Sequence, residues 1–124
     1  DESKNNPYFY AQYAYVRCSS ILAKAKYEPK EEVDLNEISN SFEIVSKAIN
    51  YPHFLKEYAL ERSPHSLVHF IKEFSADFHS FYESSPVISD NKAVSNSRLL
   101  ITLITKQILK NSFKILNVEP LEKM

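Results

Sequence analysis

Apolar side chains recur through most of this sequence at steps of three and four residues, the spacing that places them on one face of an α-helix. The pattern is strongest between Pro64 and Ser84. The apolar positions there are Leu67, Ile71, Phe74, Phe78 and either Phe81 or Tyr82. We therefore expect the central core helix over this range, with Ser63 as its N-cap and Pro64 at its first position.

The first helix is expected from Pro7 to about Tyr27, with Asn6 as its N-cap. Small residues recur along it at helical steps and form a smooth face that can lie close to another helix; they include Ala11, Ala14 and Cys18. The polar residues 1–5 are interpreted as a loop that continues from an upstream segment. Residues 28–36 carry several charges and a proline, so they are expected to form a solvated connection.

A second helix is expected from about Leu35 to Ile49. Its inward positions are Ile38, Phe42, Val45 and Ile49. Pro52 is expected to end this helix and to begin a short one that reaches about Arg62.

The last helix is expected from about Ala93 to Leu116, and Asn117 is suited to the left-handed position that follows it. Its inward positions are Leu99, Leu100, Leu103, Ile104, Ile108, Ile115 and Leu116. These segments together predict one all-α domain over residues 1–124. Its fold is an antiparallel helical bundle of about five helices, four long and one short.

The amino-acid composition excludes several kinds of functional site. The chain has 124 residues, of which 44% are hydrophobic, so it can bury a sizeable core. It has no glycine, which excludes phosphate-cradling loops that need glycine backbone conformations. The single cysteine, Cys18, excludes an internal disulfide and a cysteine-based zinc site; it indicates a reducing compartment and hence a cytoplasmic protein. No apolar run is long enough to span a membrane.

The histidines do not form a pattern typical of a metal site or a catalytic site. His65 and His69 are four residues apart, but Ser66 stands where a zinc hydrolase would need its glutamate base. His79 lies among aromatic residues and is interpreted as a semi-buried, hydrogen-bonded side chain. No metal site and no catalytic residues are predicted.

The first helix also carries a polar aromatic face. Tyr10, Tyr13 and Arg17 recur at steps of three and four, with Gln12 at their border. Flat rings beside a guanidinium and an amide are typical of single-stranded RNA recognition. The alternative is that these tyrosines are simply the core and rim of a helical bundle.

The last helix has a stripe of positive charge formed by Arg98, Lys106, Lys110 and Lys114, with Thr102 filling its gap. The stripe is either a set of phosphate contacts or an ordinary solvated face. The formal net charge of −1 does not favour binding by phosphate neutralisation alone. RNA binding would then depend on stacking and on this local stripe.

The pattern Asn-Pro-x-aromatic-Tyr-x-Gln-Tyr-Ala-x-x-Arg resembles the start of the C-terminal anticodon-binding domain, of the DALR type, of arginyl-tRNA synthetases. It matches at Asn6, Pro7, Phe9, Tyr10, Gln12, Tyr13, Ala14 and Arg17. The family usually has His and Ala where this chain has Tyr15 and Val16.

Later blocks continue the resemblance in order. Residues 64–67 and 78–82 resemble the family's central helix, and residues 98–111 its last helix. The ending Val118…Glu122-Lys123-Met124 is similar to the family's usual terminus, with Asn117 in place of the usual Gly. The catalytic domain with its ATP-binding motifs is not in this sequence, so the chain is interpreted as the C-terminal portion of a longer enzyme.

The resemblance implies that the domain binds the tRNA anticodon loop for an arginine–tRNA ligase. The residues implied in anticodon binding are Tyr10, Gln12, Tyr13, Arg17, Phe70 and Met124. The implied partners are tRNA-Arg and the upstream catalytic domain of the same chain, with no DNA and no membrane. ATP and magnesium belong to that catalytic domain, and no cofactor is expected here. The alternative is a helical protein–protein interaction module.

Overall fold

The computed structural model describes residues 6–26, 28, 32–61, 63–87 and 89–124. Within them the chain forms five α-helices and no strand. The helices are α1 (Phe9–Ala25), α2 (Leu35–Asn40), α3 (Phe42–Glu61), α4 (Pro64–Ser84) and α5 (Lys92–Ile115). The all-α class is confirmed, and α1, α4 and α5 match their expected bounds to within one helical turn. The expected loop over 1–5 and the expected helix ends at Tyr27 and Arg62 lie outside the described residues.

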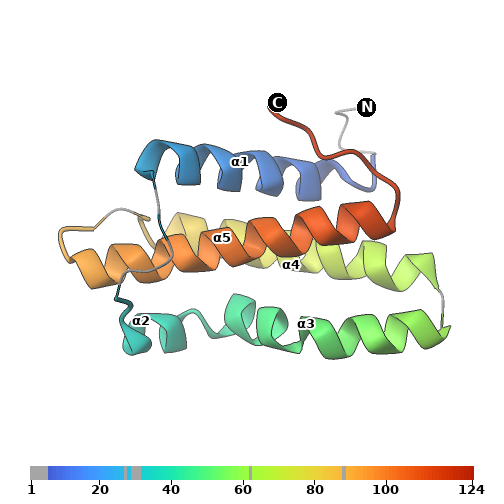
Figure 1. The fold of residues 1–124 in the computed structure, drawn as a ribbon, viewed down its shortest axis with the longest axis horizontal. Coiled ribbons are helices and arrows are strands. Elements are labelled where there is room, and N and C mark those ends of the chain that lie inside the picture. The colour runs from blue at the N-terminus through green and yellow to red at the C-terminus, as the bar shows by residue number, and fades with distance from the viewer. Residues whose placement is uncertain (1–5, 27, 29–31, 62, 88) are drawn as a thin grey trace.

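The long helices form a bundle in which α4 and α5 lie side by side between α1 and α3 (Figure 1). Both α1 and α3 contact α4 and α5, and α2 contacts α3 and α5. The chain direction in Figure 1 shows that α3 and α4, α4 and α5, and α1 and α5 run antiparallel. Because α4 and α5 lie between them, α1 and α3 expose their outer surfaces on opposite sides of the molecule.

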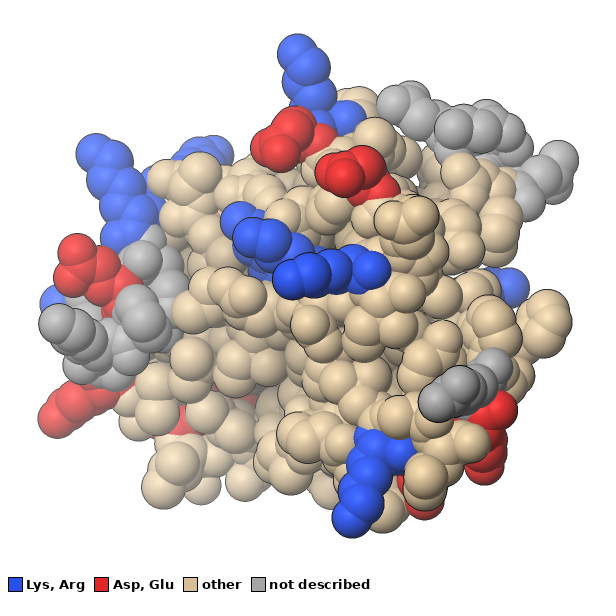
Figure 2. Space-filling view, turned by 45° about the vertical axis from the view of Figure 1, so that its right-hand side comes forward, with Lys and Arg blue, Asp and Glu red and all other residues tan. Residues whose placement is uncertain are grey.

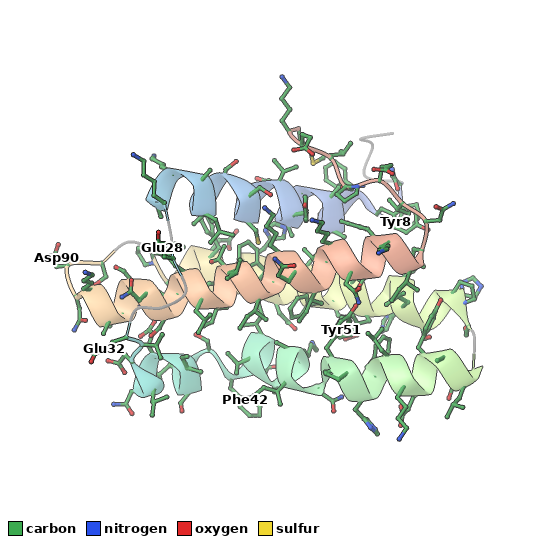
Figure 3. The ribbon with its side chains drawn as sticks, in the orientation of Figure 1. Tyr8, Glu28, Glu32, Phe42, Tyr51 and Asp90 are labelled. Carbon is green, nitrogen blue, oxygen red and sulfur yellow. The ribbon has the colours of Figure 1, made fainter. Side chains whose placement is uncertain are left out.

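The core is centred on α4, as its apolar period predicts. Leu67, Ile71, Phe74 and Phe78 are all completely buried. Burial of each such side chain stabilises the fold by roughly 1.5–3 kcal/mol. From α3, Tyr51 points toward α5 (Figure 3), where its hydroxyl lies 2.8 Å from the Oγ of Ser112.

The expected boundary between the second and third helices is wrong. The chain breaks at Ser41 instead, whose N–H bonds to the Ile38 carbonyl at 3.1 Å and closes α2 as a tight turn. Pro52 lies inside α3. Proline removes only one backbone hydrogen bond there, and Tyr51 and Phe54 beside it pack against the core and hold the helix together.

This break changes which side chains of α3 face inward. Phe42 and Ile49, both expected in the core, are 67% and 76% exposed, whereas Ile44 and Tyr51 are buried. Figure 3 shows Phe42 pointing away from the bundle. The expected period ran across the break at Ser41, and the interruption shifts the phase of the helix that follows.

The inward face of α5 is also partly different from its expectation. Ile104 and Ile115 are exposed, while Thr102 and Thr105 are buried. Each threonine hydroxyl donates to the carbonyl four residues earlier, Arg98 or Ile101, at 2.8 Å. A hydroxyl satisfied in this way can be buried without a lost hydrogen bond.

The C-terminal end of α5 aims the tail of the chain. Asn117 takes the expected left-handed conformation, with φ 58°. The Val118 N–H bonds to the Phe113 carbonyl at 2.8 Å, and the Asn117 N–H to the Lys114 carbonyl at 3.2 Å, which is a Schellman motif. The turn directs residues 118–124 across the bundle to α1 (Figure 1). None of the helices in the described ranges has the length and apolar content needed to cross a bilayer.

Candidate nucleic-acid interface

A cation–π stack joins α1 to α4 at the surface. The Arg17 guanidinium lies between the rings of Tyr13 and Tyr82, 4.6 Å and 4.4 Å from their centroids. Its Nη2 also donates to the Tyr13 hydroxyl at 2.6 Å. Tyr13 and Arg17 share one side of α1 because they are four residues apart. With Tyr10 they form a surface that we name the tyrosine–arginine face: Tyr10, Tyr13, Arg17 and Tyr82.

His79 supports this stack from α4. Its ring centroid lies 5.1 Å from that of Tyr13, and its Nδ1 is 3.4 Å from the Arg17 Nη1 that can donate to it. Burial lowers the pKa of His79, and the Arg17 charge lowers it further. A neutral imidazole can accept from Arg17, so this contact fits the half-buried role expected from the sequence.

Tyr10 extends the face toward the beginning of α4. Its side chain is 42% exposed and makes an edge-to-face contact with Phe9, with centroids 5.2 Å apart. Tyr10 also borders a pocket of about 390 Å³ whose other lining residues include His65, His69 and Lys72. Tyr10 and Tyr13 thus both leave ring surface available for stacking.

Gln12 is placed differently from its predicted neighbours. It is only 7% exposed, and both ends of its amide are used by the C-terminal tail. Its Nε2 donates to the Glu119 carbonyl, and its Oε1 accepts from the Leu121 N–H, both at 2.9 Å. The structure therefore brings the tail to α1. The role of Met124 in anticodon binding stays a prediction.

Phe70 does not lie beside the tyrosine–arginine face. Its ring stacks on Phe54, Tyr51 and Phe74, with centroids 4.7, 5.5 and 5.5 Å away. The contacts with Phe54 and Tyr51 join α4 to α3, on the opposite side of α4 from α1 (Figure 1). Its role in RNA binding stays a prediction, and its ring already has aromatic partners on α3 and α4.

The positive stripe of α5 is divided. Lys110 and Lys114 line a groove of about 250 Å³ beside residues 117–120 of the tail. The Nζ of Lys106 lies 5.7 Å from the centroid of the Tyr15 ring. Figure 2 shows lysine and arginine side chains interspersed with acidic ones over a largely uncharged face. Buried Thr102 interrupts the stripe, contrary to expectation.

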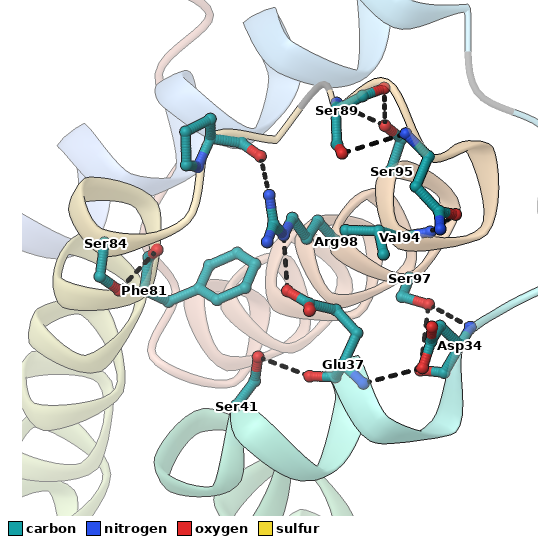
Figure 4. Close-up of polar contacts among 12 residues, drawn as sticks. Asp34, Glu37, Ser41, Phe81, Ser84, Ser89, Val94, Ser95, Ser97 and Arg98 are labelled. Atoms are coloured by element: carbon teal, nitrogen blue, oxygen red, sulfur yellow. Dashed lines mark hydrogen bonds and ion pairs between the residues drawn. The ribbon is translucent and has the colours of Figure 1, made fainter.

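Arg98 lies at the far end of α5, and its side chain is only 16% exposed. Its Nε donates to Glu37 Oε1 of α2 at 2.6 Å, and its Nη1 donates to the Pro86 carbonyl (Figure 4). It is therefore separated from the three lysines by about two helical turns or more and is held by structural contacts.

The remaining candidate chemistry is sparse. Cys18 is completely buried, and burial raises the pKa of its thiol well above the ordinary range. Among the residues that the structure describes, no three His, Cys, Asp or Glu side chains converge as metal ligands would. What this surface can do is stack flat rings and offer hydrogen-bond donors.

Two features of the interface were missed by sequence reasoning. Tyr82 was considered only as a core position, yet its ring covers Arg17, 65 residues away along the chain. The tail partners of Gln12 were not foreseen. Neither the pairing of Arg17 with Tyr82 nor that of Gln12 with the tail produces a local sequence pattern. Only the resemblance could have suggested them, because it includes both residues 78–82 and the C-terminus.

Comparisons with known proteins bear on this surface. A family model, the DALR anticodon binding domain, matches residues 11–124. The arginine–tRNA ligase of Geobacter metallireducens is 34% identical over 99% of this chain, and that of Burkholderia ambifaria is 30% identical over 99%. The chain spans only 23% and 22% of the lengths of these two relatives.

Solved structures share the fold. A Campylobacter jejuni chain described as an arginyl-tRNA synthetase superposes with a TM-score of 0.80 at 22% identity, over 100% of this chain and 28% of that one. The Thermus thermophilus arginyl-tRNA synthetase superposes with a TM-score of 0.79 at 23% identity, over 93% and 21%. At these identities the likeness establishes the helical fold alone.

Proposed function

Since the chain belongs to the DALR anticodon binding domain family, we propose that it binds a tRNA anticodon loop through the tyrosine–arginine face. The observation that carries this proposal is the exposed pair of rings at Tyr10 and Tyr13, with Arg17 held against Tyr13. Unstacked loop bases bind to such rings because every base offers a flat π-surface.

We further propose that the chain is one part of an arginine–tRNA ligase and that its RNA is tRNA-Arg. The support is the identity of 34% and 30% with two curated proteins of that name over almost the whole chain. ATP, magnesium and the aminoacylation chemistry belong, in this proposal, to the catalytic part of such a protein. Here the absence of glycine leaves no phosphate-cradling loop. A cytoplasmic location is part of the same proposal.

The test is Tyr13→Ala in this chain, with binding measured to an RNA hairpin that carries an arginine anticodon. Loss of one stacked base is worth roughly 1–3 kcal/mol, so Kd should rise about five- to 150-fold. Tyr10→Phe should be milder, because the ring still stacks without its hydroxyl.

The matched control is Phe42→Ala, which removes an aromatic ring that is 67% exposed on α3, on the other side of the bundle. It should leave Kd unchanged, with helical content measured by circular dichroism in both variants. Equal Kd values for wild type and Tyr13→Ala would contradict the proposal. A helical protein-interaction module would show the same equality, so this measurement also separates the two functions.

A further inference from the structure

Gln12 is the residue of α1 that the C-terminal tail binds to. Its Nε2 donates to the Glu119 carbonyl and its Oε1 accepts from the Leu121 N–H, both at 2.9 Å. The two partners are two residues apart, so the amide pairs with one edge of the tail much as a neighbouring strand would. Pro120 stands between them and has no N–H of its own.

This pairing uses both polar atoms of the Gln12 side chain. The side chain is 7% exposed, and its carbonyl and its amino group each have a backbone partner. An amide that read an RNA base would have to present the same atoms to solvent. Gln12 therefore differs from Tyr10 and Tyr13, which are 42% and 38% exposed.

The tail lies at the border of the tyrosine–arginine face. Successive helix residues are rotated by about 100°, so Tyr13 lies about 100° round α1 from Gln12, and Arg17 about 140°. At a radius of about 5–6 Å, 100° is an arc of roughly 10 Å. Three residues in extended conformation span about 10 Å. Residues 122–124 are thus long enough to reach Tyr13 from the point where Gln12 holds Leu121.

Two other observations place the tail beside α1. Val118 packs against the core directly after the helix-ending turn. Burial raises the pKa of Tyr15, and the nearby negative charge of Glu122 raises it further. Glu122 therefore lies near the part of α1 that carries Tyr15.

We propose that Gln12 is a positioning residue, which acts on RNA binding only by holding the tail so that residues 122–124 complete the tyrosine–arginine face. The proposal rests on the proposed function. It assigns Gln12 no contact with RNA, in place of the direct contact that the resemblance implies.

The decisive experiment is a double-mutant cycle with RNA affinity as the readout. One change is Gln12→Met, which keeps the side-chain length and removes both hydrogen bonds. The other is a chain that ends at Val118, which keeps the helix-ending turn and removes the tail. The two single variants and the double variant are each titrated with an RNA hairpin that carries an arginine anticodon.

If Gln12 acts through the tail, each single change raises Kd by about tenfold, and the combination also raises it by about tenfold. A combined effect near a hundredfold would mean that Gln12 contributes without the tail, and would overturn the proposal. An unchanged Kd in Gln12→Met, with the truncated chain weakened, would overturn it as well.

A second readout needs no RNA. Backbone ¹⁵N relaxation of residues 121–124 should show order parameters falling below about 0.6 in Gln12→Met. Gln107→Met, at an exposed glutamine of α5, should leave them unchanged. If the wild-type chain fails to bind RNA, the proposed function fails, and these order parameters still decide whether Gln12 positions the tail. Unchanged order parameters in Gln12→Met would refute that role.

Discussion

Replacement of Arg98 by methionine tests whether this cation is a structural residue or an RNA contact. The Arg98–Glu37 pair joins α5 to α2 at 2.6 Å, and the two side chains are only 16% and 14% exposed. Arg98 also donates to the Pro86 carbonyl (Figure 4). Arg98→Met would leave the Glu37 carboxylate without its cation, in a position that water reaches poorly.

Loss of one partner from a buried ion pair costs about 3–5 kcal/mol. Because this pair keeps some solvent access, we expect a fall of roughly 2–3 kcal/mol in the free energy of unfolding. That is a large part of the roughly 5–15 kcal/mol typical of a domain. Glu37→Gln combined with Arg98→Met should recover part of the loss, since no unpaired charge then remains.

The assay is urea unfolding followed by circular dichroism, with RNA affinity measured on the same samples. Lys110→Met, an exposed cation on the same helix, is the control and should change stability by less than about 0.5 kcal/mol. Wild-type stability together with weakened RNA binding in Arg98→Met would instead identify Arg98 as an RNA contact.

Three further predictions use the same chain. If Lys106, Lys110 and Lys114 contact phosphates, replacing all three by alanine should flatten the log–log salt dependence of RNA affinity by up to about 0.7–0.9 per lost contact; an identical slope would mark them as a solvated face. Cys18, buried and with a raised pKa, should resist iodoacetamide at neutral pH until urea unfolds the chain; labelling at the rate of a free thiol would contradict this. The His79 pKa is lowered by burial and by Arg17, so the unfolded state binds more protons below about pH 6.5, and the free energy of unfolding should fall as the pH drops below that value. His79→Gln should weaken this pH dependence in urea titrations at pH 7 and pH 5, and an unchanged dependence would assign it to other groups.

Local patterns were enough to predict much of the fold. The α4 stripe from Leu67 to Phe81 is buried as expected, because a helix with one continuous apolar face has one way to face the core. Asn117 takes the left-handed position because its side chain tolerates it in the absence of glycine. The small-residue face of α1 is also buried as predicted from its spacing.

Contacts between residues far apart in the sequence could not be predicted from local patterns. Arg98 meets Glu37 across 61 residues, and Gln12 meets Glu119 across 107, so no spacing along the chain reveals either contact. The burial of Thr102 and Thr105 depends on hydroxyls that bond to their own helix, which a hydrophobic pattern does not register. Tyr10, Tyr13 and Arg17 could be grouped from sequence because they lie on one helix. The resemblance alone linked Met124 of the tail to them, and Tyr82 could not be added without the fold.

RNA binding where the exposed face of α1 meets the C-terminal tail is the proposal on which the other predictions depend. It is tested most directly by titrating the ¹⁵N-labelled chain with an RNA hairpin that carries an arginine anticodon and following each backbone amide by NMR. The shifted amides should cluster in residues 10–17 and 121–124, while those of α3 stay in place. Shifts confined to α3, or no shifts at RNA concentrations that saturate a tRNA-binding domain, would contradict it.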